Sequence, residues 1–355
     1  MSFHSLFVFW AIASTAITPS VSPSRPRTAR LSRSPVWTDF RSLAVDAEAK
    51  KSAEDLLQGK VRVAVVALPA KDGSPAGAVV ASLVRNGYEF SAHHIVVDGL
   101  TTKHIFAAIA DVDSAKQTAA AHHIDELVLC HVSQGNLAVQ SISLKDDTAK
   151  QLVPVGLSES EQALEAAVSQ LYVQLVENTP VSLESIGPLR AMIQLQDARD
   201  KLHDSANVDD ADRRKATCTE VIGLTEAVIA SSPSLLEARL LRASCYDELG
   251  DDERVKQTLQ DAYAIRDPNK HSRLTLLELE GDYARFVKND VPAAMDAYLA
   301  MLEINPSNLT GLWSLIDVLV SGEVDKPTLE EAASLAARLV VSHPDSSVAQ
   351  AIAEQ

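Results

Sequence analysis

Histidines and carboxylates lie close together along the first half of the chain, where they could form a metal site. The candidates are His93, His94, His122, His123 and His131, with Asp98 and Asp125. Imidazole and carboxylate groups bind Zn²⁺ when three or four of them converge. No pair among these residues has the spacing of a known metal motif. The pattern therefore favours solvated histidines at the ends of strands and helices, and we predict no metal and no other cofactor.

A loop with the sequence Gly73-Ser-Pro-Ala-Gly77 could hold a phosphate on its backbone amides. It matches neither GxGxxG nor GxxxxGK[ST], the patterns that bind nucleotides. A turn explains it better, with Ser74 as the N-cap and Pro75 as the first helical residue. The chain also has no Gly-x-Ser-x-Gly and no His-Glu-x-x-His motif, which would mark a nucleophile or a zinc protease. We therefore predict that the protein is not an enzyme.

The thiols are too few to build a framework of disulfides. They belong to Cys130, Cys218 and Cys245, and an odd, sparse set without a CxxC pair indicates neither disulfides nor zinc. Cys130 lies in an apolar run that is typical of a strand, and Cys245 lies at a packed helix position. Both are predicted to be small core hydrophobes.

The composition describes a chain that can fold, that should not bind nucleic acid and that should repel anionic membranes. Hydrophobic residues make up 46% of the sequence, and the net charge is −16. The first 41 residues contain five arginines and one aspartate, so the remainder carries −16 − 4 = −20. A surface this acidic does not follow a phosphate backbone. We therefore exclude nucleic acid as a partner.

The elements that would position these residues begin with a predicted α/β domain over residues 42–180. A β-branched apolar run at 60–68 is typical of a buried strand, and a helix over 76–86 follows it and ends at Gly87. The later elements are expected at 94–97, 102–110 and 114–122, 125–132, 137–144, 150–155 and 158–176. The order is therefore β-α-β-α-β, then a hairpin, then α, which indicates a small mixed sheet covered by helices.

This order resembles the amino-terminal α/β domain shared by CsgG-like curli-secretion proteins, FlgO-like proteins and TolB. The resemblance rests on the opening VRVAVVAL, on the helix before IVVDG and on the hairpin DELVLCHVSQGNLAV. It carries no catalytic motif, and it implies an envelope-associated module for assembly or interaction. The chain has one short hairpin, unlike the pore-forming members, so we do not expect a channel.

Prolines recur in the second half of the chain at the period of a helical repeat. Pro233, Pro268, Pro306 and Pro344 are 35, 38 and 38 residues apart, and each closes an apolar run. A period of this length is typical of stacked helix pairs. Because one pair cannot bury its apolar face alone, neighbouring pairs must stack into a solenoid. We therefore predict an all-α solenoid over residues 233–355, preceded at 181–232 by a helical linker or a degenerate repeat.

The stretch from Leu235 to Pro268 resembles a tetratricopeptide repeat. The family positions are occupied by Ala243, Tyr246, Leu249, Gly250 and Ala262. The small alanines let two helices approach each other, and the glycine ends the first helix with a positive φ. The proline then stops the second helix.

The later units match this pattern with departures. Asn289-Asp290 replaces Gly-Asp at the turn of the second unit, and asparagine is the usual substitute in a left-handed conformation. The first helix of that unit, predicted over 274–287, has Gly281 and Tyr283 out of register. The third unit has a longer turn, over 321–327, and places Ala332 at the small-residue position. Residues 348–355 are predicted to begin a capping helix.

The first 41 residues are predicted to be a targeting segment followed by a disordered tether. The apolar run at 6–17 has the length of a signal-peptide core but is short for a membrane span. No lysine or arginine precedes it, and four arginines follow it by residue 33, which opposes ordinary export. We expect export to the periplasm or cell envelope, with an organellar transit peptide as the alternative.

These observations together favour a non-enzymatic scaffold that binds a partner protein or peptide through its repeats. Leu240, Ser244 and Asp247 share one side of a predicted helix and are the expected contacts. The chain has no stable membrane span, and its α/β domain could self-associate. The alternative function is a ligand-binding or enzymatic α/β domain with regulatory repeats. It would require polar groups at the carboxyl ends of the strands, near Pro69–Ser74, Asp98 and Ser133.

Overall fold

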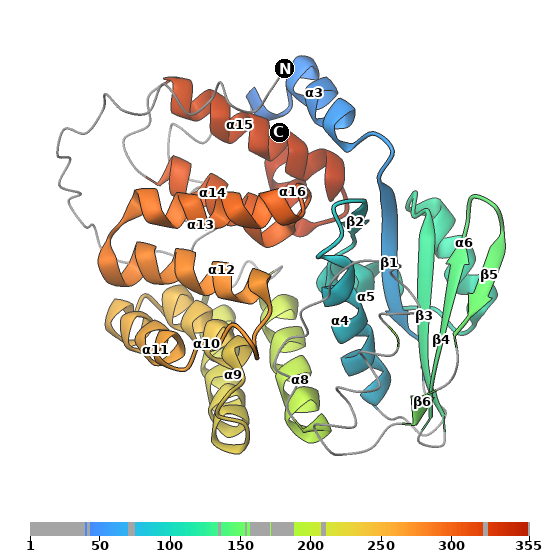
Figure 1. Ribbon diagram of the computed structural model, residues 1–355, viewed down its shortest axis with the longest axis horizontal. Coiled ribbons are helices and arrows are strands. Elements are labelled where there is room, and N and C mark those ends of the chain that lie inside the picture. Colours follow the sequence, from blue (N-terminus) through green and yellow to red (C-terminus); the bar gives the residue numbers. More distant parts are fainter. Residues whose placement is uncertain are drawn as a thin grey trace.

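The fold is an α/β unit followed by a curved run of packed helices (Figure 1). The computed structural model describes residues 40, 43–69, 75–133, 136–152, 155–156, 171, 188–206, 211–321 and 326–353. The prediction of a mixed α/β sheet with an all-α second half is confirmed. The predicted closing helix at 158–176 and the targeting segment at 1–41 lie almost entirely outside the described residues.

One mixed sheet forms the centre of the α/β unit, with strand order β2-β1-β3-β4-β5. β1 (Val61–Ala67) pairs in parallel with β2 (His94–Val96) and β3 (Glu126–Ser133). The hairpin partner β4 (Asn136–Ser143) runs antiparallel to β3, and β5 (Thr148–Gln151) and β6 (Val155–Gly156) both pair with β4. Helical connections are required wherever neighbouring strands run parallel.

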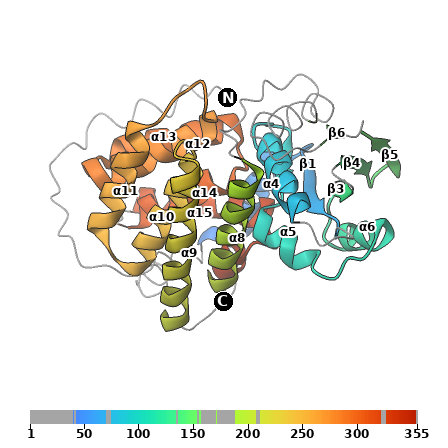
Figure 2. The ribbon, with the colours of Figure 1, turned by 90° about the horizontal axis from the view of Figure 1, so that it is seen from below.

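Helices cover both faces of this sheet, so its central strands are apolar on both sides. Val63 and Val65 pack against α4 (Ala76–Tyr88) on one face. Ala64 and Val66 lie on the other face, in the core that Ala115 and Ala119 of α6 also enter. The elements on that face are α5 (Gly99–Ile105) and α6 (Val112–Ala121), and Figure 2 shows them across the sheet from α4.

The helical half consists of successive neighbours in the sequence that pack on one another. Its elements are α8 (Leu189–Ala206), α9 (Ala211–Ser231), α10 (Leu236–Leu249), α11 (Asp252–Ala264), α12 (Arg273–Asp282), η2 (Tyr283–Lys288), α13 (Val291–Ile304), α14 (Leu309–Val320), α15 (Lys326–Ser342) and α16 (Ser347–Ala353). Figure 1 shows them as an arc from α8 to α16. The predicted turns hold their expected conformations, with φ of 75° at Gly250 and 54° at Asn289.

A π-helical segment explains why the second unit is out of register. η2 adds a wider turn directly after α12, and such a turn changes the register between the residues at its start, Gly281 and Tyr283, and the turn at Asn289 that follows it. Gly281 lies just before it, where a Cβ would stand 2.8 Å from Cζ of Tyr298. Tyr298 is fully buried and donates a hydrogen bond of 2.7 Å to Asp282. Gly281 is therefore required by the close approach of this ring.

Several predicted boundaries need correction. The helix predicted over 76–86 continues through Gly87 to Tyr88, and Pro75 precedes the helix instead of opening it, while Ser74 lies outside the described residues. The fifth strand, predicted over 150–155, is split into β5 and β6. The sequence reading also missed α3 (Ala47–Leu57), whose N-cap Asp46 accepts a hydrogen bond from the amide of Glu48.

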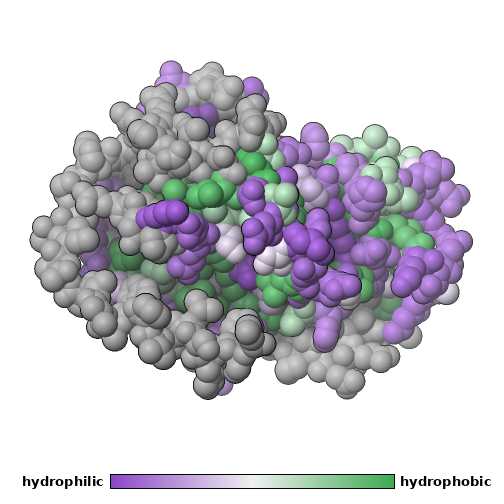
Figure 3. Space-filling view, turned by 90° about the horizontal axis from the view of Figure 1, so that it is seen from above, coloured by the Kyte–Doolittle hydropathy of each residue, from purple (hydrophilic) through white to green (hydrophobic). Residues whose placement is uncertain are grey.

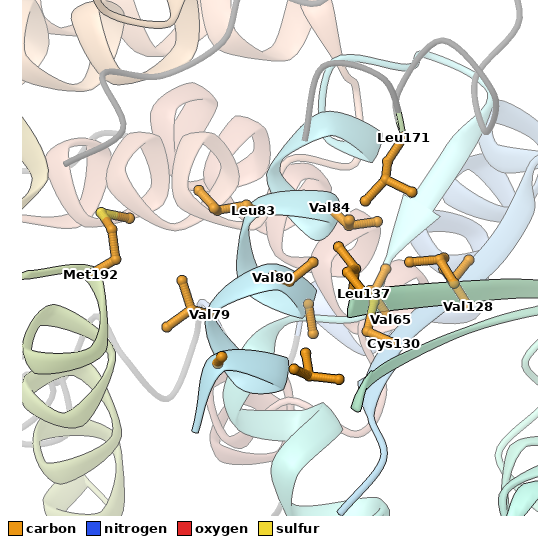
Figure 4. Close-up of a cluster of buried hydrophobic side chains, with 14 of the residues drawn as sticks. Val65, Val79, Val80, Leu83, Val84, Val128, Cys130, Leu137, Leu171 and Met192 are labelled. Carbon is orange, nitrogen blue, oxygen red and sulfur yellow. The ribbon is translucent and has the colours of Figure 1, made fainter. Parts of the chain in front are cut away.

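The two halves share one hydrophobic core at the start of the arc. α4 lies between the sheet and α8, with Val79 and Leu83 on the side of Met192 (Figure 4). The same core continues to Leu235 and Ala238 at the start of α10. Burial of this apolar surface fixes the first helices of the arc to the sheet.

The far end of the arc also returns to the α/β unit. α3 packs on α15, and Phe40 and Ala44 enter the core of α12 to α16. Asp345, before α16, forms an ion pair of 2.7 Å with Arg62 of β1. The arc therefore holds the α/β unit at both of its ends.

Candidate functional site

The predicted histidine cluster is divided between two places in the fold. His94 Nδ1 lies 2.7 Å from Oγ of Ser91, its ring meets Tyr88 edge-on, and its Nε2 lies 3.8 Å from Glu126. Glu126 accepts hydrogen bonds from Tyr88 (3.0 Å) and Ser141 (2.7 Å). Burial lowers the pKa of His94 and, together with the nearby Glu126, raises that of Tyr88. This group is a satisfied polar cluster at the amino ends of β2 and β3.

His122 takes part in a different contact. Its Nδ1 lies 3.2 Å from Oδ1 of Asp345, and the other carboxylate oxygen of Asp345 binds Arg62. Asp125 accepts a hydrogen bond of 2.8 Å from the backbone amide of Arg62. Within the part of the chain that the structure describes, no three histidine, cysteine or carboxylate side chains come together as a metal site would require.

The carboxyl ends of the strands are the place where a ligand-binding α/β domain would need convergent polar groups. Asp98 lies there and caps α5, accepting a hydrogen bond of 2.9 Å from the amide of Thr101. Pro69 is exposed. Residues 70–74 and the side chain of Ser133 lie outside the described residues, so the contribution of that loop stays a prediction.

An arginine that the sequence reading missed lies beside Asp98. Arg85 of α4 donates a hydrogen bond of 3.1 Å from Nη2 to the carbonyl oxygen of Val65 in β1. The last residue of β1 that pairs with β2 is Val63, so Val65 has no partner residue in β2. The guanidinium of Arg85 takes the place of that partner. Burial lowers the pKa of Arg85, and the charge of Asp98 opposes that shift. The helical pattern around Arg85 gave no signal, since a charged residue near a helix end usually faces solvent.

Two of the three cysteines are neighbours. Cys218 of α9 and Cys245 of α10 are both fully buried in one small cluster with Ala198 and Val221. A hydrogen bond between the two thiols lowers the pKa of Cys218 and raises that of Cys245. Cys130 is buried in the sheet core, where burial raises its pKa to about 12. The expectation that Cys130 and Cys245 are core residues is confirmed.

The expected partner contacts on α10 differ in exposure. Leu240 is 6% exposed and packs in the core with Leu259 and Leu276. Asp247 is 5% exposed. Ser244 is exposed and donates a hydrogen bond of 3.1 Å to the carbonyl oxygen of Leu240. Of these three side chains, Ser244 is the one that an external protein could reach without a change in the fold.

Histidines connect successive proline turns along one edge of the arc. His271 Nε2 lies 2.9 Å from the carbonyl oxygen of Ser234, beside Pro233. His343 Nε2 lies 2.6 Å from the carbonyl oxygen of Ser307, beside Pro306. The two links span 37 and 36 residues along the chain. They therefore repeat at the period of the helix pairs.

The same edge faces the α/β unit at two of these turns. Ser307 donates a hydrogen bond of 3.2 Å to the carbonyl oxygen of His94, and Asp345 binds Arg62 and His122. At the turn after α11, by contrast, Pro268, Asn269 and Lys270 are exposed. This turn borders an open cavity of about 140 Å³. Its described lining residues are Arg266, Pro268, His271, Arg273, Leu276 and Glu280.

Exposed apolar residues of the arc gather on α13. Val291 and Leu299 are 47% and 40% exposed, and Met295 lies between them at four-residue spacing from each, so all three share one helix face. We call these three residues the α13 stripe. Outside the arc, Leu43 and Leu56 have comparable exposures of 36% and 46%. On the face that Figure 3 shows, hydrophilic side chains lie among apolar ones.

None of the helices within the described residues is long and apolar enough to cross a membrane. Comparison of the sequence with models of known protein families gave no match. A comparison with curated proteins gave none either.

Proposed function

We propose that the protein is a non-enzymatic scaffold whose tetratricopeptide-like arc binds a partner protein. The observation that carries this proposal is the α13 stripe, in which the exposed Val291 and Leu299 flank the half-buried Met295. Apolar side chains gathered on one exposed face commonly mark a surface for another protein. Stacked helix pairs also offer an extended surface that single domains lack.

The arrangement of the repeats supports the tetratricopeptide assignment. Gly250 and Asn289 end the first helices in the left-handed conformation, and Ala243, Ala262 and Ala294 are buried at the small-residue positions. The first helices α10 and α14 are almost wholly buried. A partner is therefore offered mainly the second helices, which include α13, together with Ser244 of α10.

The α/β unit would act as the fixed end of this scaffold. The resemblance of its sequence to the amino-terminal domain of the CsgG-like, FlgO-like and TolB proteins motivates this role. We propose that it docks on a component of the cell envelope or on a second copy. Its attachment at both ends of the arc would hold the partner surface in a constant orientation.

Affinity capture from native extract, with the full chain as bait, tests the proposal. The variant Val291→Ser/Leu299→Ser removes the apolar stripe, and Asp296→Ser/Glu303→Ser is the matched control on exposed polar positions of α13. We expect the stripe variant to lose specific partners that the control retains. Retention of the same partners by both variants would contradict the assignment of partner binding to α13.

A further inference from the structure

The cavity beside Pro268 combines positive charge with an apolar wall. Arg266, directly after the C-cap of α11, and Arg273, the first residue of α12, both line it. Pro268 and Leu276 supply apolar surface. The segment 266–273 carries three basic residues and one acidic residue, in a chain whose net charge is −16. This small basic region therefore contrasts with the rest of the surface.

The structure holds Arg266 in a defined position. Its guanidinium carbon lies 3.4 Å from the centroid of the Tyr263 ring, and its Nη1 donates to the carbonyl oxygen of Tyr263. A guanidinium has five N–H donors, so one bond leaves most of its capacity for a ligand. Because stacking restricts the side chain, less entropy is lost when a ligand binds.

Arg273 already interacts with a carboxylate, but weakly. Its Nη1 lies 3.7 Å from Oε2 of Glu280, and the two side chains are 55% and 39% exposed. An exposed pair at that distance contributes little to stability. Glu280 can therefore be displaced by a carboxylate that reaches both arginines.

His271 forms a rigid wall of the cavity. Its Nδ1 lies 2.9 Å from the amide nitrogen of Asp267, and its Nε2 contacts the carbonyl oxygen of Ser234. Both ring nitrogens are thus engaged within the fold. His271 therefore shapes the cavity, and the two arginines supply its positive charge.

We infer that this cavity binds a side-chain carboxylate of an acidic peptide segment. The inference deepens the proposed function, on which it rests, by naming the chemistry of the partner. Glu280 on the rim disfavours a doubly charged phosphate, and the apolar wall suits the methylene groups of a glutamate. The exposed turn at 268–270 leaves the cavity open to a chain, whereas the turns at Ser307 and Asp345 are occupied by the α/β unit.

Titration of the full chain with an N-acetylated, C-amidated tetraglutamate peptide, followed by calorimetry at low salt, tests this inference. Arg266→Ala and Arg273→Ala should each weaken binding about fivefold to tenfold, since each removes a charge-assisted hydrogen bond. Arg254→Ala is the matched control, because Arg254 is an exposed arginine of α11 that does not line the cavity. It should leave the affinity unchanged.

The substitution Glu280→Gln should change the affinity for tetraglutamate in the opposite direction. It removes the competing carboxylate, so we expect tetraglutamate to bind roughly twofold to fivefold more tightly, as relief of one weak ion pair would give. Tetraglutamine should not bind, and inorganic phosphate should bind more weakly than tetraglutamate.

Unchanged binding in the folded Arg266→Ala/Arg273→Ala variant would overturn the inference, as would tighter binding of phosphate than of the peptide. The tetraglutamate titration and the affinity capture can fail independently of each other. If the full chain captures no partner that depends on the α13 stripe but still binds tetraglutamate, the scaffold is refuted and the cavity is retained. Capture that survives without any tetraglutamate binding would refute the cavity alone.

Discussion

The α/β unit and the helical arc handle polar groups in different ways. In the sheet, Glu126 accepts hydrogen bonds from Tyr88 and Ser141, and Arg85 donates one to Val65, so these polar groups bind neighbours within the same unit. In the arc, polar groups concentrate at the proline turns, where they link one repeat to the next or reach across to the sheet. In the proposed scaffold, the sheet would therefore serve as a closed anchor, and the arc would present the surfaces that a partner uses.

The largest expected effect concerns the packing of the arc at Gly281. Gly281→Ala would force a methyl group into the buried ring of Tyr298, so we expect a loss of about 2–3 kcal/mol in the free energy of unfolding. Urea unfolding measures this free energy. Gly223→Ala in α9 is the control, because no atom lies within 4 Å of its added Cβ, and it should be neutral or stabilise by about 0.5–1 kcal/mol. Equal effects would refute the close packing.

The next largest effect on stability is expected at the contact between the α/β unit and the arc. Arg62 and Asp345 are 11% and 26% exposed, so a double-mutant cycle with Arg62→Met and Asp345→Asn should give a coupling of about 1 kcal/mol. The pair Lys51–Asp55, which lies on one exposed helix, serves as the comparison and should show no measurable coupling. A negligible value for Arg62–Asp345 would mean that the arc does not hold the sheet there.

A smaller effect concerns pH. Burial lowers the pKa of His343 from 6.5, against the opposing effects of its bond to Ser307 and of Asp98, while Arg62 adds to the lowering. Below pH 6.5 the unfolded chain therefore binds a proton that the folded chain resists, and stability falls as the pH falls. His343→Gln keeps a donor for Ser307 and should reduce this slope in urea unfolding series. An unchanged slope of stability against pH would contradict the assignment of this effect to His343.

The smallest effect is expected at Cys130. Because burial raises its pKa to about 12, the thiolate is scarce at pH 8. Iodoacetamide should leave Cys130 unmodified in the native protein and alkylate it in urea, with peptide mass spectrometry as the readout. Native alkylation of Cys130 would show that the sheet core opens more readily than the arc that holds it.

The sequence predicted local features that depend on near neighbours. The left-handed turns at Gly250 and Asn289 and the strand of Cys130 follow from residue type and spacing. The π-helical turn was visible only as Gly281 and Tyr283 out of register. Contacts between distant residues, such as Arg62 with Asp345 or Cys218 with Cys245, leave no periodic signal, because they depend on how the arc curves back.

The same distinction explains the candidate sites. The histidines are near one another in sequence, yet strand direction places His94 and His122 in different contacts. Leu240 was chosen for its helix face, and its burial depends on α11 and α12, which pack over that face. The cavity beside Pro268 combines residues of two helices and a turn, so no single motif identified it.

A photo-reactive residue at one position of each region tests the central claim most directly. Leu299 of α13 represents the arc and Ala149 of β5 represents the exposed sheet edge. We predict protein adducts in native extract from position 299 that disappear with Val291→Ser and persist with Asp296→Ser. Adducts from position 149 without any from position 299 would contradict the account, because the sheet would then be the binding surface.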